Sequence, residues 1–260
     1  MFDLKIGVQL SSLRLPFQKS LRAASEMGAG AVEIDGRYGL KPAEMSRTGI
    51  RHLKKILDTS NLRVCAIGFR TRRGYNVLED LDARVEATKQ AMSLGYQLGA
   101  LVVVNQIGHV AADKDDQSRQ LLIEVLTELG KHGQKTGTFL AAETGNESGA
   151  ELADLVTDLP EGSLAVALNP GNLVIHGFSA SEAARDLGNH IQYVRAKDGM
   201  RDLAQGRGLE VALGRGTVDW PEIMGLLEDH NYRGYFTLER EQSNDPLGEI
   251  SAGVKYLRNL

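Results

Sequence analysis

The sequence predicts a single (β/α)8 barrel that spans residues 1–260. Eight short apolar runs recur along the chain, and segments with helical periodicity lie between them. From Lys5 to Tyr235, seven steps cover 230 residues, so the mean spacing is about 33 residues, enough for one strand, one helix and two loops. A doubly wound open sheet is the alternative, but the even spacing gives no sign of its topological switch point.

The eight apolar runs are too short for helices, are often β-branched and do not alternate cleanly with polar residues. This pattern is typical of parallel strands that are buried on both faces. In chain order, the predicted strands are Leu4–Leu10, Ala31–Ile34, Leu62–Gly68, Leu101–Val104, Phe139–Ala142, Leu164–Leu168, Ile191–Ala196 and Tyr235–Leu238.

Helical periodicity is clearest after the third predicted strand, where one stripe consists of Leu81, Val85, Thr88, Met92 and Gly95. Several predicted helices end in a glycine just before the next strand, because glycine permits the left-handed backbone that closes a helix. These glycines are Gly28, Gly99, Gly137 and Gly234. After the seventh strand, Gly206–Gly208 and Gly214–Gly216 predict turns of a long loop rather than a phosphate-binding loop.

Composition and charge exclude several function classes. With 30 basic and 34 acidic residues the net charge is −4, which argues against a nucleic-acid-binding protein with a broad basic face. Cys65 is the only cysteine and cannot form an internal disulfide, so we expect a core thiol in a reducing compartment. Asp3 and Lys5 interrupt the first apolar stretch, so it is not a secretory signal. We therefore expect a cytoplasmic protein without nucleic-acid or membrane partners.

In a barrel of this class, reactive side chains project from the carboxyl ends of the strands. The polar residues at those ends are Gln9, Glu33, Asp35, Arg70, Asn105, Gln106, Glu143, Asn169, Asn172, Arg195, Lys197, Asp198, Glu239, Arg240 and Glu241. Glu143 and Glu239 directly follow apolar runs. A carboxylate at the end of a buried strand is costly unless it has a partner or a task, so both residues are candidates for function.

Seven short segments carry a resemblance to known proteins through their order and spacing. They are Lys5–Leu10, Gly30–Asp35, Ala141–Thr144, Leu168–Leu173, Val194–Asp198, Leu213–Trp220 and Gly234–Glu241. Together they resemble the xylose isomerase-like barrels, a superfamily that includes sugar epimerases, hydroxypyruvate isomerases and inosose dehydratases. The resemblance covers nearly the whole chain. It implies a small polyhydroxylated carbonyl compound as the substrate, without identifying the sugar.

The resemblance also implies a divalent metal site, which metal-dependent members build from Glu, Asp, His and Glu on strands five to eight. The matching residues here are Glu143, Asn169, Arg195 and Glu239, and a further histidine of some relatives corresponds to Asn172. Arginine stays protonated and has no free lone pair, so Arg195 cannot coordinate a cation. We therefore expect no metal and no other cofactor, with Arg195 supplying the positive charge that the carboxylates need.

Three functions remain open at this point. In a metal-free isomerase or epimerase, Glu143 and Glu239 would exchange a proton next to a carbonyl while Arg195 or Lys197 stabilises the enediolate oxygen. A sugar-binding barrel would have kept the pocket and lost the chemistry. A metal-dependent epimerase or dehydratase would use the two glutamates, Asn169 and waters, which the nearby Arg195 disfavours. We expect the first function, in a chain that could form a homo-oligomer.

Substrate binding is expected to involve several of the strand-end residues, with strand-end packing as the alternative role for some of them. The expected binding residues are Gln9, Glu33, Arg70, Asn105, Asn169, Asn172, Arg195 and Lys197. Arg70 belongs to a cluster with Arg72 and Arg73, which could hold a phosphate or carboxylate of the substrate or could belong to a solvated loop. Asp35 is expected to order the loop that follows its strand.

Overall fold

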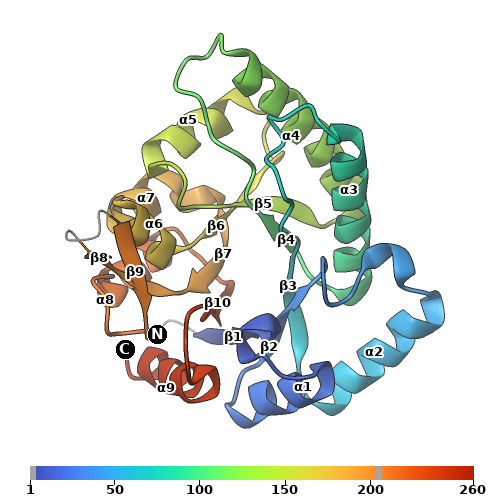
Figure 1. The fold of residues 1–260 in the computed structure, drawn as a ribbon, viewed down its shortest axis with the longest axis vertical. Coiled ribbons are helices and arrows are strands. Elements are labelled where there is room, and N and C mark those ends of the chain that lie inside the picture. Colours follow the sequence, from blue (N-terminus) through green and yellow to red (C-terminus); the bar gives the residue numbers. More distant parts are fainter. Residues whose placement is uncertain (1–3, 203–206) are drawn as a thin grey trace.

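The computed structural model describes residues 4–202 and 207–260, and its main feature is a closed barrel of eight parallel strands (Figure 1). Around the barrel the strand order is β1-β10-β7-β6-β5-β4-β3-β2. The barrel strands are β1 (Lys5–Gln9), β2 (Ala31–Asp35), β3 (Arg63–Gly68), β4 (Val102–Asn105), β5 (Phe139–Glu143), β6 (Ala165–Leu168), β7 (Ile191–Ala196) and β10 (Tyr235–Leu238). The predicted (β/α)8 barrel is confirmed.

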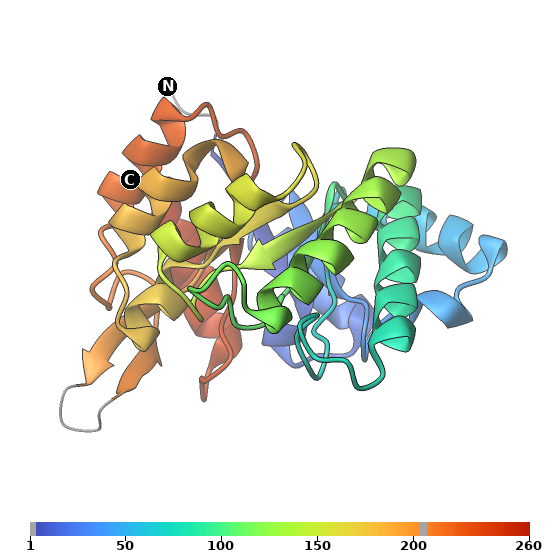
Figure 2. The same ribbon diagram turned by 90° about the horizontal axis from the view of Figure 1, so that it is seen from above.

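Helices alternate with the strands and surround the barrel (Figures 1 and 2). They are α1 (Phe17–Glu26), α2 (Arg47–Thr59), α3 (Leu81–Leu98), α4 (Gln117–Thr136), α5 (Gly149–Asp158), α6 (Pro170–His176), α7 (Ala180–Leu187), α8 (Trp220–Asp229) and α9 (Pro246–Arg258). Three short 3-10 helices accompany them: η1 (Leu10–Leu13), η2 (Pro42–Glu44) and η3 (Gly188–His190). None of the helices in residues 4–202 and 207–260 has the length and apolar character needed to cross a bilayer.

Small side chains form much of one buried cluster of strand residues. This cluster combines alanines from β2, β3, β5 and β6 with Cys65 and Tyr193. Cys65 is buried and free, and burial raises the pKa of its thiol to about 12. It is therefore a core thiol, as the sequence predicts.

The glycine signals mark three helix ends but fail at a fourth. Gly28, Gly99 and Gly137 have φ angles of +83°, +81° and +84°, the left-handed conformation expected there. The chain leaves α8 instead through Asn231 at φ +56°, a residue type that tolerates this region. Gly234 has a different role, because a Cβ atom at this position would lie 2.3 Å from Oη of Tyr232.

The long loop predicted after the seventh strand contains an antiparallel hairpin, so the turn predicted at Arg207–Gly208 is wrong, whereas Gly214–Gly216 lie in a turn as predicted. The hairpin consists of β8 (Asp198–Asp202) and β9 (Arg207–Val211), and Gly206 lies outside the described residues. Its glycines allow close packing on α6, since a Cβ at Gly199 or Gly208 would lie within 3 Å of Ile175. The hairpin was not predicted because its sequence is rich in glycine and polar residues and lacks the apolar pattern by which strands are recognised.

Candidate functional site

The guanidinium of Arg195 is the centre of the carboxyl-terminal end of the barrel. Its Nη2 donates to Oε1 of Glu33 at 2.6 Å, and its Nη1 donates to Oε1 of Glu143 at 2.8 Å. Oε1 of Glu239 lies 3.5 Å from the same Nη1. Burial would lower the pKa of Arg195, but the three glutamates outweigh it and hold that pKa well above its usual value. Arg195 is thus a permanent cation within a ring of carboxylates.

Glu33 is held by donors from two strands, β1 and β7. Besides Nη2 and Nε of Arg195, it accepts hydrogen bonds from Nε2 of Gln9 at 3.0 Å and from Oη of Tyr193 at 2.7 Å. Ser12 in turn donates to Oε1 of Gln9 at 2.6 Å, which fixes the orientation of that amide. Gly68 completes the fit, because a Cβ there would lie 2.6 Å from Oε1 of Glu33. The sequence-predicted residues Gln9 and Glu33 therefore belong to the Arg195 cluster.

Glu143 and Glu239 meet at the side-chain amide of Asn169. Nδ2 of Asn169 donates to Oε1 of Glu143 at 2.8 Å and to Oε2 of Glu239 at 3.1 Å. Asn172 adds a longer bond to Oε1 of Glu143 at 3.3 Å. Oε2 of Glu143 is buried and has no hydrogen-bond partner among the described residues. The four residues aligned with the metal ligands, Glu143, Asn169, Arg195 and Glu239, therefore converge at one place.

Arg70, Glu241 and Lys197 form a charged layer beside this cluster. Arg70 donates to Oε1 of Glu239 at 3.1 Å and to Oε1 of Glu241, and Nζ of Lys197 donates to Oε2 of Glu241 at 2.8 Å. Burial would raise the pKa of Glu241, but the charges of Lys197 and Arg70 lower it to about 2. Arg70 was a predicted anion-binding residue, yet two carboxylates of the chain itself engage its guanidinium. Arg73 pairs with Glu79.

Two strand-end residues bind backbone and loop groups rather than the cluster. Asn105 donates from Nδ2 to Oγ1 of Thr71 and Oη of Tyr75, and its Oδ1 accepts from the Thr71 amide. These contacts tie the loop after β3 to the barrel. The carboxylate of Asp198 accepts hydrogen bonds from backbone amides near the base of the hairpin. These amides belong to Gly199, Gly214, Gly216 and Val218.

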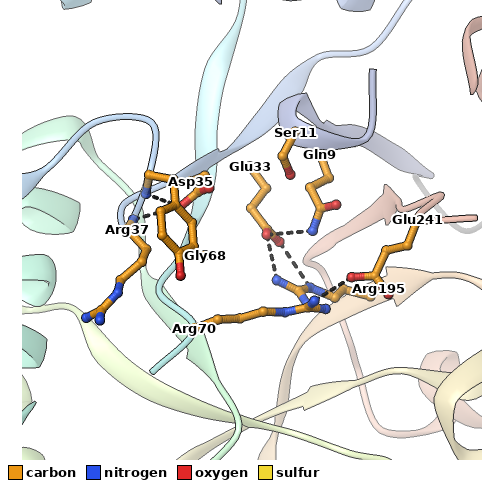
Figure 3. A pocket seen from close by; sticks show the side chains of 10 residues that line it. Gln9, Ser11, Glu33, Asp35, Arg37, Gly68, Arg70, Arg195 and Glu241 are labelled. Carbon is orange, nitrogen blue, oxygen red and sulfur yellow. Dashed lines mark hydrogen bonds and ion pairs between the residues drawn. The ribbon is translucent and has the colours of Figure 1, made fainter. Parts of the chain in front are cut away.

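A cavity of about 180 Å³ opens beside the cluster (Figure 3). It is lined by Gln9, Ser11, Glu33, Asp35, Arg37, Tyr38, Gly68, Arg70, Arg195 and Glu241. Ser11, Arg37, Tyr38 and Gly68 were not predicted from the sequence. Glu143 and Glu239 are absent from this lining, and their side chains are 0 % exposed. Lining residues therefore separate the cavity from the predicted glutamate pair: Arg195 contacts both glutamates, and Gln9 and Arg70 contact Glu239.

The residues do not fit the divalent metal that the resemblance implies. The guanidinium of Arg195 stands where three carboxylates converge, and its charge opposes a second cation at that point. Within the described parts of the chain, no group of three or more His, Cys, Asp or Glu side chains could hold a metal ion.

Comparison with known proteins identifies the family. A family model described as the xylose isomerase-like TIM barrel matches residues 21–260. The chain belongs to this family. A xylose isomerase domain protein from Planctomyces limnophilus has the same fold, with a TM-score of 0.85 at 21 % identity over 99 % of this chain and 96 % of the other. A xylose isomerase-like barrel from Mycobacterium smegmatis, solved with magnesium, has a TM-score of 0.80 at 20 % identity over 99 % and 96 %.

Curated relatives of this xylose isomerase-like chain carry the name inosose dehydratase. The protein of that name from Clostridium beijerinckii is 22 % identical over 247 residues, which cover 84 % of this chain and 82 % of the relative. A solved D-allulose 3-epimerase from Methylomonas sp., in complex with D-allulose, has a TM-score of 0.78 at 16 % identity over 100 % and 98 %. At these identities the structural likeness shows the shared fold.

Proposed function

We propose that this xylose isomerase-like barrel acts on a small polyhydroxylated carbonyl compound as an isomerase or epimerase that needs no resident divalent metal. The observation that carries the proposal is the place of Arg195. Its guanidinium occupies the focal point of Glu33, Glu143 and Glu239 and also lines the cavity. A fixed cation at this position can stabilise the negative oxygen that develops when a proton leaves the carbon next to a carbonyl.

The proton transfer requires one carboxylate to remove a proton and another to return it. In the proposed step, Glu143 or Glu239 accepts the proton as the C–H bond breaks, and the electron pair moves into an enediolate whose oxygen faces Arg195. Return of the proton to the opposite face of the same carbon gives an epimer, and return to the neighbouring carbon gives an isomer. Because both carboxylates contact Arg195 and neither lines the cavity, the proposed transfer requires side chains of the cluster to shift when the substrate enters.

Removal of such a proton also begins the elimination of water from a β-hydroxy carbonyl compound. The dehydratase name of the curated relatives and the epimerase name of the Methylomonas structure therefore fit one type of site. The direction of the second half of the reaction depends on which substrate group lies next to the enediolate.

A binding protein without catalysis is the second candidate function, and one specific observation favours it. The side chains of Glu143 and Glu239 are 0 % exposed and both contact Arg195 and Asn169. A barrel that only binds sugars would need no access to these carboxylates. Exchange of a substrate proton with solvent deuterium, described next, separates the two functions.

We expect Glu143→Gln and Glu239→Gln each to abolish exchange of a substrate α-proton with solvent deuterium. Each change removes a proton acceptor but keeps the shape of the side chain, so the expected loss of rate is about 100-fold or more. NMR would follow the exchange in D₂O across a panel of ketoses, aldoses and their phosphates. Glu161→Gln, an exposed glutamate outside the cluster, is the control.

Unchanged exchange in both cluster variants would contradict the paired-carboxylate mechanism. If the wild-type protein binds sugars from the panel but exchanges no proton in any of them, the binding function is supported instead.

We further expect purified protein to hold far less than one equivalent of Mn, Co, Zn or Mg after dialysis, and its Tm to be unaffected by these ions. The reason is electrostatic, because the positive charge of Arg195 already stands among the carboxylates that a metal would bind and opposes a second cation there. Elemental analysis and calorimetry provide the two measurements. A stoichiometric metal would contradict the proposal.

A double variant is the matched positive control for this metal test. Arg195→His with Asn169→Asp rebuilds a set of carboxylates and one imidazole suited to Mn or Co. This variant should gain about 3 kcal/mol of stability when the metal concentration is about 100 times its Kd. If the variant is indifferent to millimolar metal, the four aligned positions do not form the site that the alignment implies.

A further inference from the structure

Three cations line the cavity, and two of them are engaged by carboxylates of the chain. Arg195 contacts Glu33 and Glu143, while Arg70 contacts Glu239 and Glu241. The third cation, Arg37, pairs with no carboxylate within residues 4–202 and 207–260. An arginine that lines a cavity without an internal partner has its hydrogen-bond donors available for a ligand.

The loop after β2 holds Arg37 in place. Oδ1 of Asp35 accepts the backbone amides of Arg37 at 2.7 Å and of Tyr38 at 3.0 Å, so this carboxylate orders the turn, as the sequence predicts. The guanidinium carbon of Arg37 lies 5.9 Å from the ring centroid of Phe69, a buried residue, in a cation–π contact. The side chain is therefore only partly exposed and is positioned before a ligand arrives.

The two sides of the cavity differ in their charge. On the Arg195 side, four carboxylates pair with three cations, which leaves one excess negative charge. The cations are Arg70, Arg195 and Lys197, and the carboxylates are Glu33, Glu143, Glu239 and Glu241. An acidic group of the substrate would find its cations there already paired, whereas hydroxyl groups can bond with Gln9 and Ser11. On the Arg37 side, the carboxylate of Asp35 is engaged by backbone amides of the turn. Arg37 lies across the cavity from the Arg70–Glu241 pair and extends away from it (Figure 3).

We infer that the substrate carries an acidic group, a carboxylate or a phosphate, and that Arg37 binds this group. The inference rests on the proposed function and adds the substrate class and its orientation. The acidic end lies against Arg37, where the planar guanidinium can donate two parallel hydrogen bonds. The hydroxylated carbonyl end then points toward Arg195. Tyr38, which is 81 % exposed and lines the same wall, can cover the bound molecule with its ring.

The test compares acidic ligands with neutral counterparts by calorimetric titration. D-glucuronate is paired with D-glucose, D-gluconate with D-glucitol, and D-fructose 6-phosphate with D-fructose, so the first two pairs report a carboxylate and the third a phosphate. We expect the wild-type protein to prefer the acidic member of at least one pair by about 10- to 100-fold, the effect of a charged hydrogen bond. Arg37→Gln should remove this preference and leave the affinity for the neutral member unchanged.

Arg72→Gln is the matched control, because Arg72 is exposed, does not line the cavity and gives the same change in net charge. It should keep the wild-type preference. The inference is overturned if the wild-type protein shows no preference for any acidic member, or if Arg37→Gln keeps the preference. Its failure is distinguishable from failure of the catalytic proposal, because binding preference is measured without turnover and proton exchange is measured in the Glu143 and Glu239 variants.

Discussion

Arg195→Ala is expected to lower the free energy of unfolding by about 3–5 kcal/mol near neutral pH, the cost of removing one partner from a buried charge cluster. The change leaves three buried carboxylates, those of Glu33, Glu143 and Glu239, without the cation that they share. The donors that remain are neutral side chains such as Asn169 and the cation Arg70, which reaches only Glu239 in this group. Urea denaturation followed by circular dichroism would measure the loss.

The pH dependence distinguishes lost charge from lost packing. A proton on one of the carboxyls can replace the missing positive charge, so the deficit of the variant should shrink as the pH falls from about 8 to about 5. Arg22→Ala is the comparison, because the side chains of Arg22 and its partner Glu26 are 82 % and 63 % exposed, and exposed pairs contribute only about 0–1 kcal/mol. If Arg195→Ala loses little stability, or loses the same amount at every pH, then supplying charge to the buried carboxylates is not the main role of Arg195.

The barrel and the centre of the site could be predicted from the sequence for related physical reasons. Parallel strands buried on both faces leave continuous apolar runs, and a barrel brings the ends of those runs together. Glu143, Asn169, Arg195 and Glu239 each follow or end such a run, and the structure places them in contact. Strand position brings these residues to one end of the barrel, and the resemblance to the metal ligands of the family singles them out from the other strand-end residues.

The loops were less accessible, because their side chains are placed by contacts rather than by periodicity. Asn105 ends a strand, as predicted, but its side chain binds the loop after β3. Arg37 lies beyond the strand end, and only the turn at Asp35 and the contact with Phe69 bring it to the cavity. The basic cluster around Arg70 indicated an anion-binding loop, because the sequence alone does not show that Arg70 pairs with the distant residues Glu239 and Glu241.

Glu147 is a further buried carboxyl that the sequence analysis did not single out. It lies between β5 and α5 and is only 4 % exposed, and its Oε2 has no hydrogen-bond partner in the part of the chain that the structure describes. Burial, with a smaller contribution from Glu151, raises the pKa of Glu147 to about 8.

We expect Glu147→Gln to make the protein less sensitive to alkaline pH. Because the pKa of Glu147 is higher in the folded chain than the usual 4.5, its proton stabilises the fold fully below about pH 4.5, and this contribution is lost as the pH rises toward 8. Between about pH 5 and pH 8 the wild-type protein should therefore lose about 3 kcal/mol that the variant keeps. Urea denaturation at both pH values measures the difference, with Glu161→Gln as the exposed control. Equal losses in the wild type and Glu147→Gln would show that Glu147 is ionised in the folded protein at neutral pH.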